Sequence, residues 1–165
     1  MLSPKSLLIA LLYISSSAFC QKTELLAIED FEMVKSEKYV PFYKDNNRNA
    51  LAINAAKFQG VYTAAKTTFD LEKGMYNIRV TSLTETDGES SYQLYINNEL
   101  IGEFQNPLTE VDYAPHYHIF KELKLKKGDE IRIAFNSHSN GKIPEGDAFA
   151  FSRGRWRSLE FLILE

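Results

Sequence analysis

The sequence predicts an all-β fold, an antiparallel β-sandwich in a single domain. Two observations indicate it. Short runs alternate apolar and polar residues, and they are joined by tight turns at some junctions and by long polar loops at others. After residue 20 no segment shows the apolar period of a long amphipathic helix, although Ala50 to Phe58 is rich in alanine and permits a short helix instead of a strand.

The chain opens with the pattern of a secretion signal. Lys5 precedes the apolar run Leu7 to Ile14, small residues follow, and the run is too short to span a bilayer. Cleavage after Cys20 predicts a signal peptide over residues 1–20 and a secreted domain over residues 21–165, in the periplasm or outside the cell. The alternative is a lipoprotein anchored through Cys20, which the bulky Phe19 disfavours.

Cysteine usage and charge limit the partners. Cys20 is the single cysteine, so the mature chain has no disulfide and its stability depends on the core. About 145 residues suffice for one such core. The formal charge of −3 becomes about −4 without Lys5, and no long block of Lys or Arg is present. These features argue against nucleic acid or an anionic membrane as the partner.

Three segments show the clearest period of two, as expected for strands with one buried face. The alternating apolar residues are Tyr76, Ile78 and Val80; Tyr92, Leu94 and Ile96; and Ile131, Ile133 and Phe135. Outward residues such as Tyr95 are interpreted as cross-strand partners or as a second platform for a glycan.

Turn lengths predict which end of the sandwich carries the site. Residues 71–74, 97–99 and 126–129 are short turns with Gly or Asn, whereas residues 84–90, 105–117 and 137–147 are long connections. If consecutive strands are antiparallel, the short turns share one end and the long loops share the other. We therefore expect a binding site made of loops at one end.

The long loops combine carboxylates, amides, imidazoles and aromatic rings, which suits a sugar with hydroxyls at its rim and C–H groups on its faces. The predicted ligand-binding residues of these loops are Glu85, Asp87, Tyr113, His116, His138 and Asn140. Two metal interpretations remain open: calcium at the acidic turn around Gly88, and zinc at His116 and His118, for which no third ligand is evident. Each has a plainer alternative, a solvated turn or surface polar residues.

A basic cluster surrounds the single tryptophan. Arg153, Arg155 and Arg157 flank Trp156, which can stack on a sugar while an arginine binds a uronate or a sulfate. We therefore include Arg153, Arg155 and Trp156 among the expected ligand-binding residues. The alternative is that Trp156 packs at the rim of the sandwich under the arginine stems.

Two tracts carry a resemblance to a known class of modules. The tract F-D-L-E-K-G-M-Y-N-I-R-V-T-S-L-T-E-T-D-G-E-S-S-Y-Q-L-Y begins at Phe69, and the tract N-S-H-S-N-G-K-I-P-E-G-D-A-F-A-F-S-R-G-R-W-R-S-L begins at Asn136. Together with the acidic start Ile28 to Glu32, they resemble the β-jelly-roll carbohydrate-binding modules of families six and thirty-five.

The resemblance implies a jelly roll that binds glycans without cleaving them and often holds one structural calcium ion. Acidic residues of the first and last strands share that ion in such modules. The matching positions are Glu29 or Glu32 and Glu160. It also implies a polysaccharide or oligosaccharide as ligand and a polysaccharide-degrading enzyme as a partner.

The sequence therefore predicts secreted, non-catalytic binding of polysaccharide through loops at one end of the sandwich. The mature chain has no serine-hydrolase turn, no zinc-protease helix and no cysteine nucleophile. Two alternatives stay open: an adhesion or protein-interaction domain, and a small hydrolase or lyase that uses Glu85 with Asp87 or Asp147.

Overall fold

The structure is a computed structural model that describes residues 23–164. The predicted signal peptide, residues 1–20, lies outside the described residues. The elements in chain order are β1 (Glu24–Leu26), α1 (Ala27–Asp30), β2 (Glu32–Met33), β3 (Phe42–Asp45), β4 (Ala50–Ile53), β5 (Tyr62–Thr68), β6 (Gly74–Leu83), β7 (Ser91–Ile96), β8 (Glu99–Gln105), β9 (Pro115–Leu125), β10 (Glu130–Asn136), β11 (Pro144–Glu145), β12 (Ala148–Phe149) and β13 (Trp156–Ile163). Within residues 23–164, no helix has the length and apolar character needed to cross a membrane.

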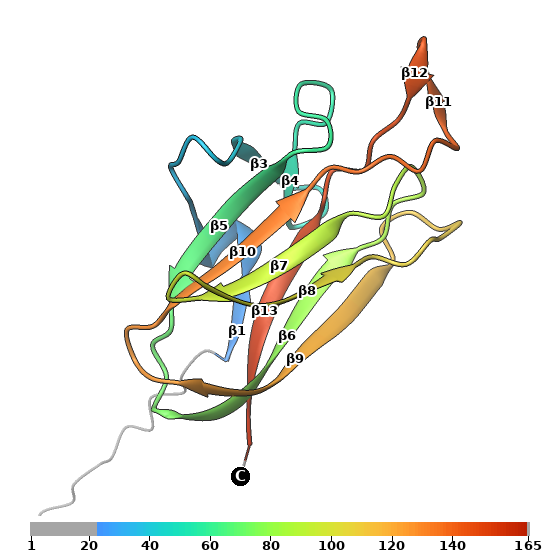
Figure 1. The fold of residues 1–165 in the computed structure, drawn as a ribbon. Helices are drawn as coiled ribbons and strands as arrows, with labels where there is room; N and C mark the ends of the chain where they lie inside the picture. Colours follow the sequence, from blue (N-terminus) through green and yellow to red (C-terminus); the bar gives the residue numbers. More distant parts are fainter. Residues whose placement is uncertain (1–22, 165) are drawn as a thin grey trace, which may run out of the picture.

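Two antiparallel sheets pack face to face (Figure 1). Sheet A has the order β3-β4-β13-β6-β9, with β1 also paired to β13, and sheet B has the order β2-β5-β10-β7-β8. β11 and β12 form a separate hairpin that projects from the loop end (Figure 1). The predicted all-β antiparallel sandwich is confirmed.

The alternating segments form strands as their pattern predicts. In β6, Tyr76, Ile78 and Val80 are buried, and the residues between them are partly exposed. The alanine-rich segment from Ala50 is a strand, β4, and not a helix. All four residues of β4 are buried, so both of its faces are covered.

The short turns and the long loops lie at opposite ends, as the turn lengths predict (Figure 1). Asn97 and Asn98 take the positive φ that a two-residue hairpin requires. One boundary differs from the prediction: β9 begins at Pro115, so His116 and Tyr117 lie on a strand and not in a loop. Glu24 and Ile163, at the outer ends of β1 and β13, lie toward the short-turn end (Figure 1).

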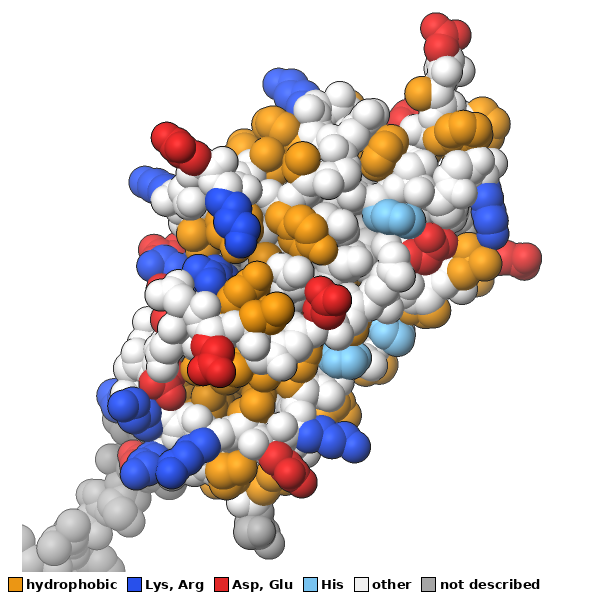
Figure 2. Space-filling view, viewed as in Figure 1, with side chains coloured by type: hydrophobic (Ala, Val, Ile, Leu, Met, Phe, Trp, Pro, Cys, Tyr) orange, Lys and Arg blue, Asp and Glu red, His pale blue; other side chains and the backbone are white. Residues whose placement is uncertain are grey.

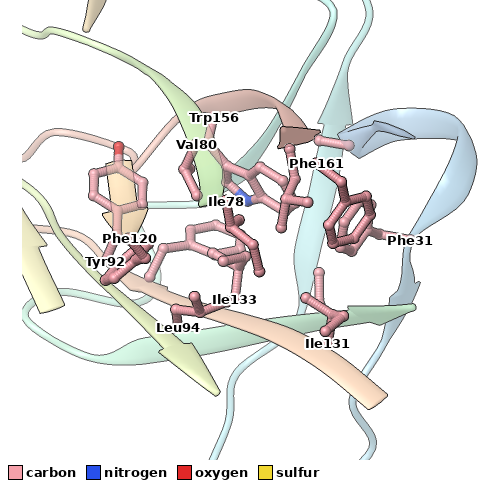
Figure 3. Packing of buried hydrophobic residues seen from close by; sticks show 14 of the residues in the cluster. Phe31, Ile78, Val80, Tyr92, Leu94, Phe120, Ile131, Ile133, Trp156 and Phe161 are labelled. Atoms are coloured by element: carbon pink, nitrogen blue, oxygen red, sulfur yellow. The ribbon is translucent and has the colours of Figure 1, made fainter. Parts of the chain in front are cut away.

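The core fills the space between the sheets and is rich in aromatic rings (Figure 3). Phe31 packs edge-on against Trp156 with ring centroids 4.8 Å apart, and Phe69 packs edge-on against Phe161 at 4.9 Å. Tyr92 stacks on Phe104 at 4.8 Å. Such aromatic pairs add to the free energy gained by burial within residues 23–164, which contain no cysteine.

Gly88 gives a test of how closely two of the loops approach each other. A Cβ at this position would lie 2.0 Å from the carbonyl oxygen of His138, a main-chain atom. We expect Gly88→Ala to lower the free energy of unfolding by about 3 kcal/mol, the upper end of the cost of overpacking. Urea denaturation followed by circular dichroism measures it.

The matched control is Gly141→Ala, where the added Cβ meets open space and the cost comes only from a φ of +69°. That variant is expected to lose about 1 kcal/mol. Equal losses in the two variants would contradict the close approach.

Candidate functional site

A buried ion-pair network organises the loop end. The Arg155 guanidinium is paired with Glu85 through Nη1 and with Asp45 through Nε, the latter at 2.8 Å. The second oxygen of Glu85 accepts hydrogen bonds from the main-chain N–H groups of Arg153 at 2.9 Å and of Arg155 at 3.4 Å. The network therefore joins β3, the loop after β6 and the approach to β13.

Glu85 and Arg155 are both almost fully buried, so neither offers its charged group to a ligand. The prediction that Glu85 and Arg155 contact a ligand directly is therefore corrected. These two residues hold the loops in position. Burial raises the pKa of Glu85 to about 7, against the opposing effect of the Arg155 charge.

Tyr113 lies between two arginines. The Arg48 guanidinium carbon is 3.6 Å from the centre of the Tyr113 ring, and that of Arg155 is 5.1 Å away. Tyr113 has a φ of 65°, which is uncommon for a bulky side chain, and its N–H donates to the carbonyl oxygen of Thr84 at 2.6 Å. The loop after β8 is thus fixed against the loop after β6.

Two adjoining hollows lie beside this network and share Tyr43 and Asn54. The first, about 240 Å³, is completed by Arg153, and the second, about 300 Å³, extends to Lys57 and Phe58. Tyr43 is 36% exposed, and its hydroxyl lies 3.5 Å from Nη1 of Arg153. We call the surface formed by Tyr43, Asn54, Lys57 and Arg153 the tyrosine–arginine surface.

The floor beneath Tyr43 follows from strand pairing. Tyr43 pairs with Ala52 and Asp45 pairs with Ala50, and paired residues share one face of a sheet. Trp156 pairs with Leu51 on the opposite face, inside the core. Alanines on the outer face of β4 leave room for the Arg155 network and for Tyr43 above them.

Three further predicted residues join the loops after β6 and β10. Asn140 donates through Nδ2 to the carbonyl of Thr86 at 3.0 Å, and Nδ1 of His138 accepts the N–H of Glu89 at 3.1 Å. Asp87 is half-buried, and its Oδ1 has no hydrogen-bond partner within residues 23–164. Burial raises the pKa of the Asp87 carboxyl. The structure thus brings Asp87, His138 and Asn140 together.

Trp156 and His116 do not lie on the tyrosine–arginine surface. Trp156 is 0% exposed and packs against Phe31, so its expected stacking on a ligand is corrected in favour of packing in the core. His116 and His118 are partly buried on β9, and His118 stacks on Phe104 with ring centroids 4.4 Å apart. Burial lowers the pKa of both imidazoles.

The residues implied as calcium ligands are not brought together. Glu29 and Glu32 line a hollow with Lys66, whose ammonium lies 3.6 Å from Glu32. Glu160 lies in the other sheet and is paired with Arg79. Within residues 23–164, no group of three or more His, Cys, Asp or Glu side chains is placed to hold a metal ion. The expected set therefore does not fit one calcium ion.

No family model matches the chain. The uncharacterized protein P23 of Formosa agariphila is 33% identical over 123 residues, which cover 73% of this chain and 27% of that protein. The probable alpha-glucuronidase A of Neosartorya fischeri is 24% identical over 136 residues, which cover 74% of this chain and 16% of that protein. The chain therefore spans about a quarter or less of the length of these relatives.

Solved structures share the whole sandwich. The CBM36-1 domain of a multidomain xylanase from the hindgut metagenome of Trinervitermes trinervoides matches with a TM-score of 0.58, 13% identity and coverage of 87% of this chain and 98% of that domain. A family 6 carbohydrate-binding module matches with a TM-score of 0.54, 13% identity and coverage of 86% and 93%. The chain has the fold of a carbohydrate-binding module.

A carbohydrate-binding module CBM36, solved in complex with calcium and xylotriose, matches with a TM-score of 0.52, 16% identity and coverage of 85% of this chain and 99% of that one. The resemblance to β-jelly-roll carbohydrate-binding modules is therefore confirmed for the fold.

The sequence pattern missed Tyr43, Asp45, Arg48, Asn54 and Lys57. Asp45 and Arg155 are 110 residues apart in the chain, and no local period links them. The polar residues just outside the alanine-rich buried strand β4 were the signal in the sequence that could have indicated this surface. The sequence did supply Arg153, which lies on this surface.

The pKa of Glu85 generates a prediction about stability. Because its folded value of about 7 exceeds the ordinary 4.5, the folded chain holds the proton more tightly than the unfolded chain. The resulting stability is present below pH 4.5 and is lost as the pH rises through 7, by about 3 kcal/mol from this group.

Glu85→Gln should remove this part of the pH dependence, since Gln does not titrate. Urea denaturation of both proteins at pH 4.5, 6 and 7.5 measures the free energy of unfolding. Parallel pH profiles for the two proteins would show that Glu85 does not take up a proton in this range.

Proposed function

We propose that this chain binds polysaccharide reversibly at the loop end of the sandwich, on the tyrosine–arginine surface. The observation that carries the proposal is the exposed ring of Tyr43, flanked by two hollows that it shares with Asn54. The fold of a carbohydrate-binding module supports the same conclusion.

The chemistry of this surface suits a sugar ring. The Tyr43 ring offers a face to the C–H groups of a pyranose, and the Asn54 amide and the Arg153 guanidinium offer hydrogen bonds to the hydroxyls. Asp87, Tyr113, His138 and Asn140 set the loops beside it. A shallow surface of this kind supports weak binding, in the millimolar to micromolar range, equivalent to about −4 to −8 kcal/mol.

We propose that the role is binding without cleavage. Glu85, one of the carboxylates that the sequence offered for hydrolysis, is buried against Arg155. Asp147 lies in the turn of the projecting β11–β12 hairpin (Figure 1). An acid and a base on either side of a glycosidic bond need a defined separation, which this placement does not support.

The proposed function also includes secretion and an enzyme partner. A secretion signal over residues 1–20 would place the domain where polysaccharides occur, outside the cell or in the periplasm. The structural likeness to a domain of a multidomain xylanase supports an enzyme as its partner. Linkage of weak binding modules to an enzyme or to one another raises the overall affinity.

Protein interaction is the second candidate, favoured by apolar side chains at the loop tips. Leu108 and Ile143 face each other across a hollow of about 370 Å³, and Phe149 on the hairpin is 48% exposed. Such a patch suits an adhesive contact. Failure to bind any polysaccharide would move this candidate to first place.

Tyr43→Ala tests the glycan site. We expect it to weaken binding to a retained polysaccharide about tenfold, which is equivalent to about 1.4 kcal/mol, because the stacking face is lost. Affinity electrophoresis and calorimetry against a panel of soluble polysaccharides measure the change, and a reducing-end assay on the same mixtures tests for cleavage.

Tyr117→Ala is the matched control, since Tyr117 is 56% exposed on the outer face of β9. Its affinity should equal that of the unchanged protein. A loss on Tyr117→Ala with none on Tyr43→Ala would place the site at β9, the opposite edge of sheet A from β3, and new reducing ends would contradict a non-catalytic role.

A further inference from the structure

We infer that the tyrosine–arginine surface selects glycans that carry negative charge, with Arg153 and Lys57 as the groups that bind the anionic substituents. This inference rests on the proposed function and names the class of glycan. The ligand chemistry is a carboxylate or a sulfate ester on a sugar ring.

The arginines at the loop end differ in whether they have a carboxylate partner. At the loop end, Arg155 is neutralised by Glu85 and Asp45. Within residues 23–164, Arg48, Arg153 and Arg157 form no ion pair. A chain with a net charge of −3 thus leaves Arg153, which lines a hollow with the exposed Tyr43, without a carboxylate partner.

The main chain around Arg153 is held by hydrogen bonds and by a close contact at Gly154. Its main-chain N–H donates to Glu85, and its main-chain carbonyl accepts the N–H of Ile53 at 2.8 Å. The next residue, Gly154, has a φ of 59°, and a Cβ there would lie 2.4 Å from the carbonyl oxygen of Asn136. The backbone of Arg153 is therefore fixed on both sides, whereas its side chain is exposed.

The guanidinium of Arg153 lies beside the hydroxyl of Tyr43. Its contact within the described chain is the Tyr43 hydroxyl, 3.5 Å from Nη1, which is at the limit for a hydrogen bond. Arginine offers a planar set of donors that matches the oxygens of a carboxylate or a sulfate, and such charge-assisted bonds are stronger than those to a hydroxyl. The side chain is positioned beside the stacking ring with most of its donors unused.

Arg153 lines one of the two hollows and Lys57 lines the other, and both hollows share Tyr43 and Asn54. A sugar stacked on Tyr43 would thus have a cation in each adjoining hollow. The carboxyl of Asp87, whose pKa is raised mainly by burial, forms no ion pair with Arg153 within residues 23–164.

The face viewed in Figure 2 offers a comparison. Acidic and basic side chains are interspersed over it, with hydrophobic ones between them, and no continuous cationic track runs across this face of the described residues (Figure 2). On sheet B, Arg132 also lacks an ion pair, and it stacks on Tyr95 with its guanidinium carbon 4.4 Å from the ring centre. Arg132 is therefore a matched control for Arg153.

The test uses two pairs of glycans that differ only in charge. One pair is glucuronoxylan oligosaccharide and its carboxyl-reduced form, and the other is carrageenan oligosaccharide and its desulfated form. Calorimetry with the unchanged protein, Arg153→Ala, Arg153→Lys and Arg132→Ala gives each affinity at low and at high salt. Arg153→Ala and Arg132→Ala remove the same charge, so the comparison separates the local site from net charge.

We expect the unchanged protein to bind one anionic glycan at least tenfold more tightly than its neutral form, with the preference weakened by salt. Arg153→Ala should remove most of that preference and leave only the part due to Lys57, Arg153→Lys should keep more of it, and Arg132→Ala should keep all of it. A preference in the first pair assigns a uronate, and one in the second pair assigns a sulfate.

Equal binding of charged and neutral forms would overturn this inference and leave the proposed glycan binding intact. An undiminished preference in Arg153→Ala would also overturn it, because the anion would then be bound elsewhere. Failure of every glycan to bind would overturn the proposed function as well.

Discussion

The buried pairing of Arg155 with Glu85 and Asp45 is the interaction on which the loop end depends. It joins three segments that are distant in sequence, and Tyr113, Arg153 and the outer face of β4 are all placed by it. Ions buried in this way must be matched, since removing one partner of a buried pair costs about 3–5 kcal/mol. Glu85 and Arg155, which the sequence presents as ligand-binding residues, therefore act here as the frame of the loop end.

The fold could be predicted because its determinants are local. The alternation around Ile78, Leu94 and Ile133 fixes which faces are buried, and turn lengths alone assign each loop to an end. The alanine-rich segment at Ala50 was ambiguous, since short apolar runs suit a strand and a helix equally. Pairing with β3 and β13 decided it, and such pairing is not visible in a short window of sequence.

The candidate site was predicted less well, for a physical reason. Residue type shows that a group is charged or aromatic, but not whether another group has already neutralised or covered it. Glu85 and Trp156 have the chemistry of a sugar site and are buried. Tyr43 and Asn54, which no sequence pattern indicated, are exposed. Arg153 and Arg155 are two residues apart, yet one faces solvent and the other lies in the network. Burial is set by contacts across the whole chain.

The position of the first and last strands, β1 and β13, has a consequence for how the domain can be used. The outer ends of β1 and β13 lie side by side at the short-turn end, opposite the long loops (Figure 1). A polypeptide joined at either end would leave the sandwich away from the tyrosine–arginine surface. Attachment therefore does not obstruct that surface, and the same domain can be placed before, after or between other domains while still facing outward.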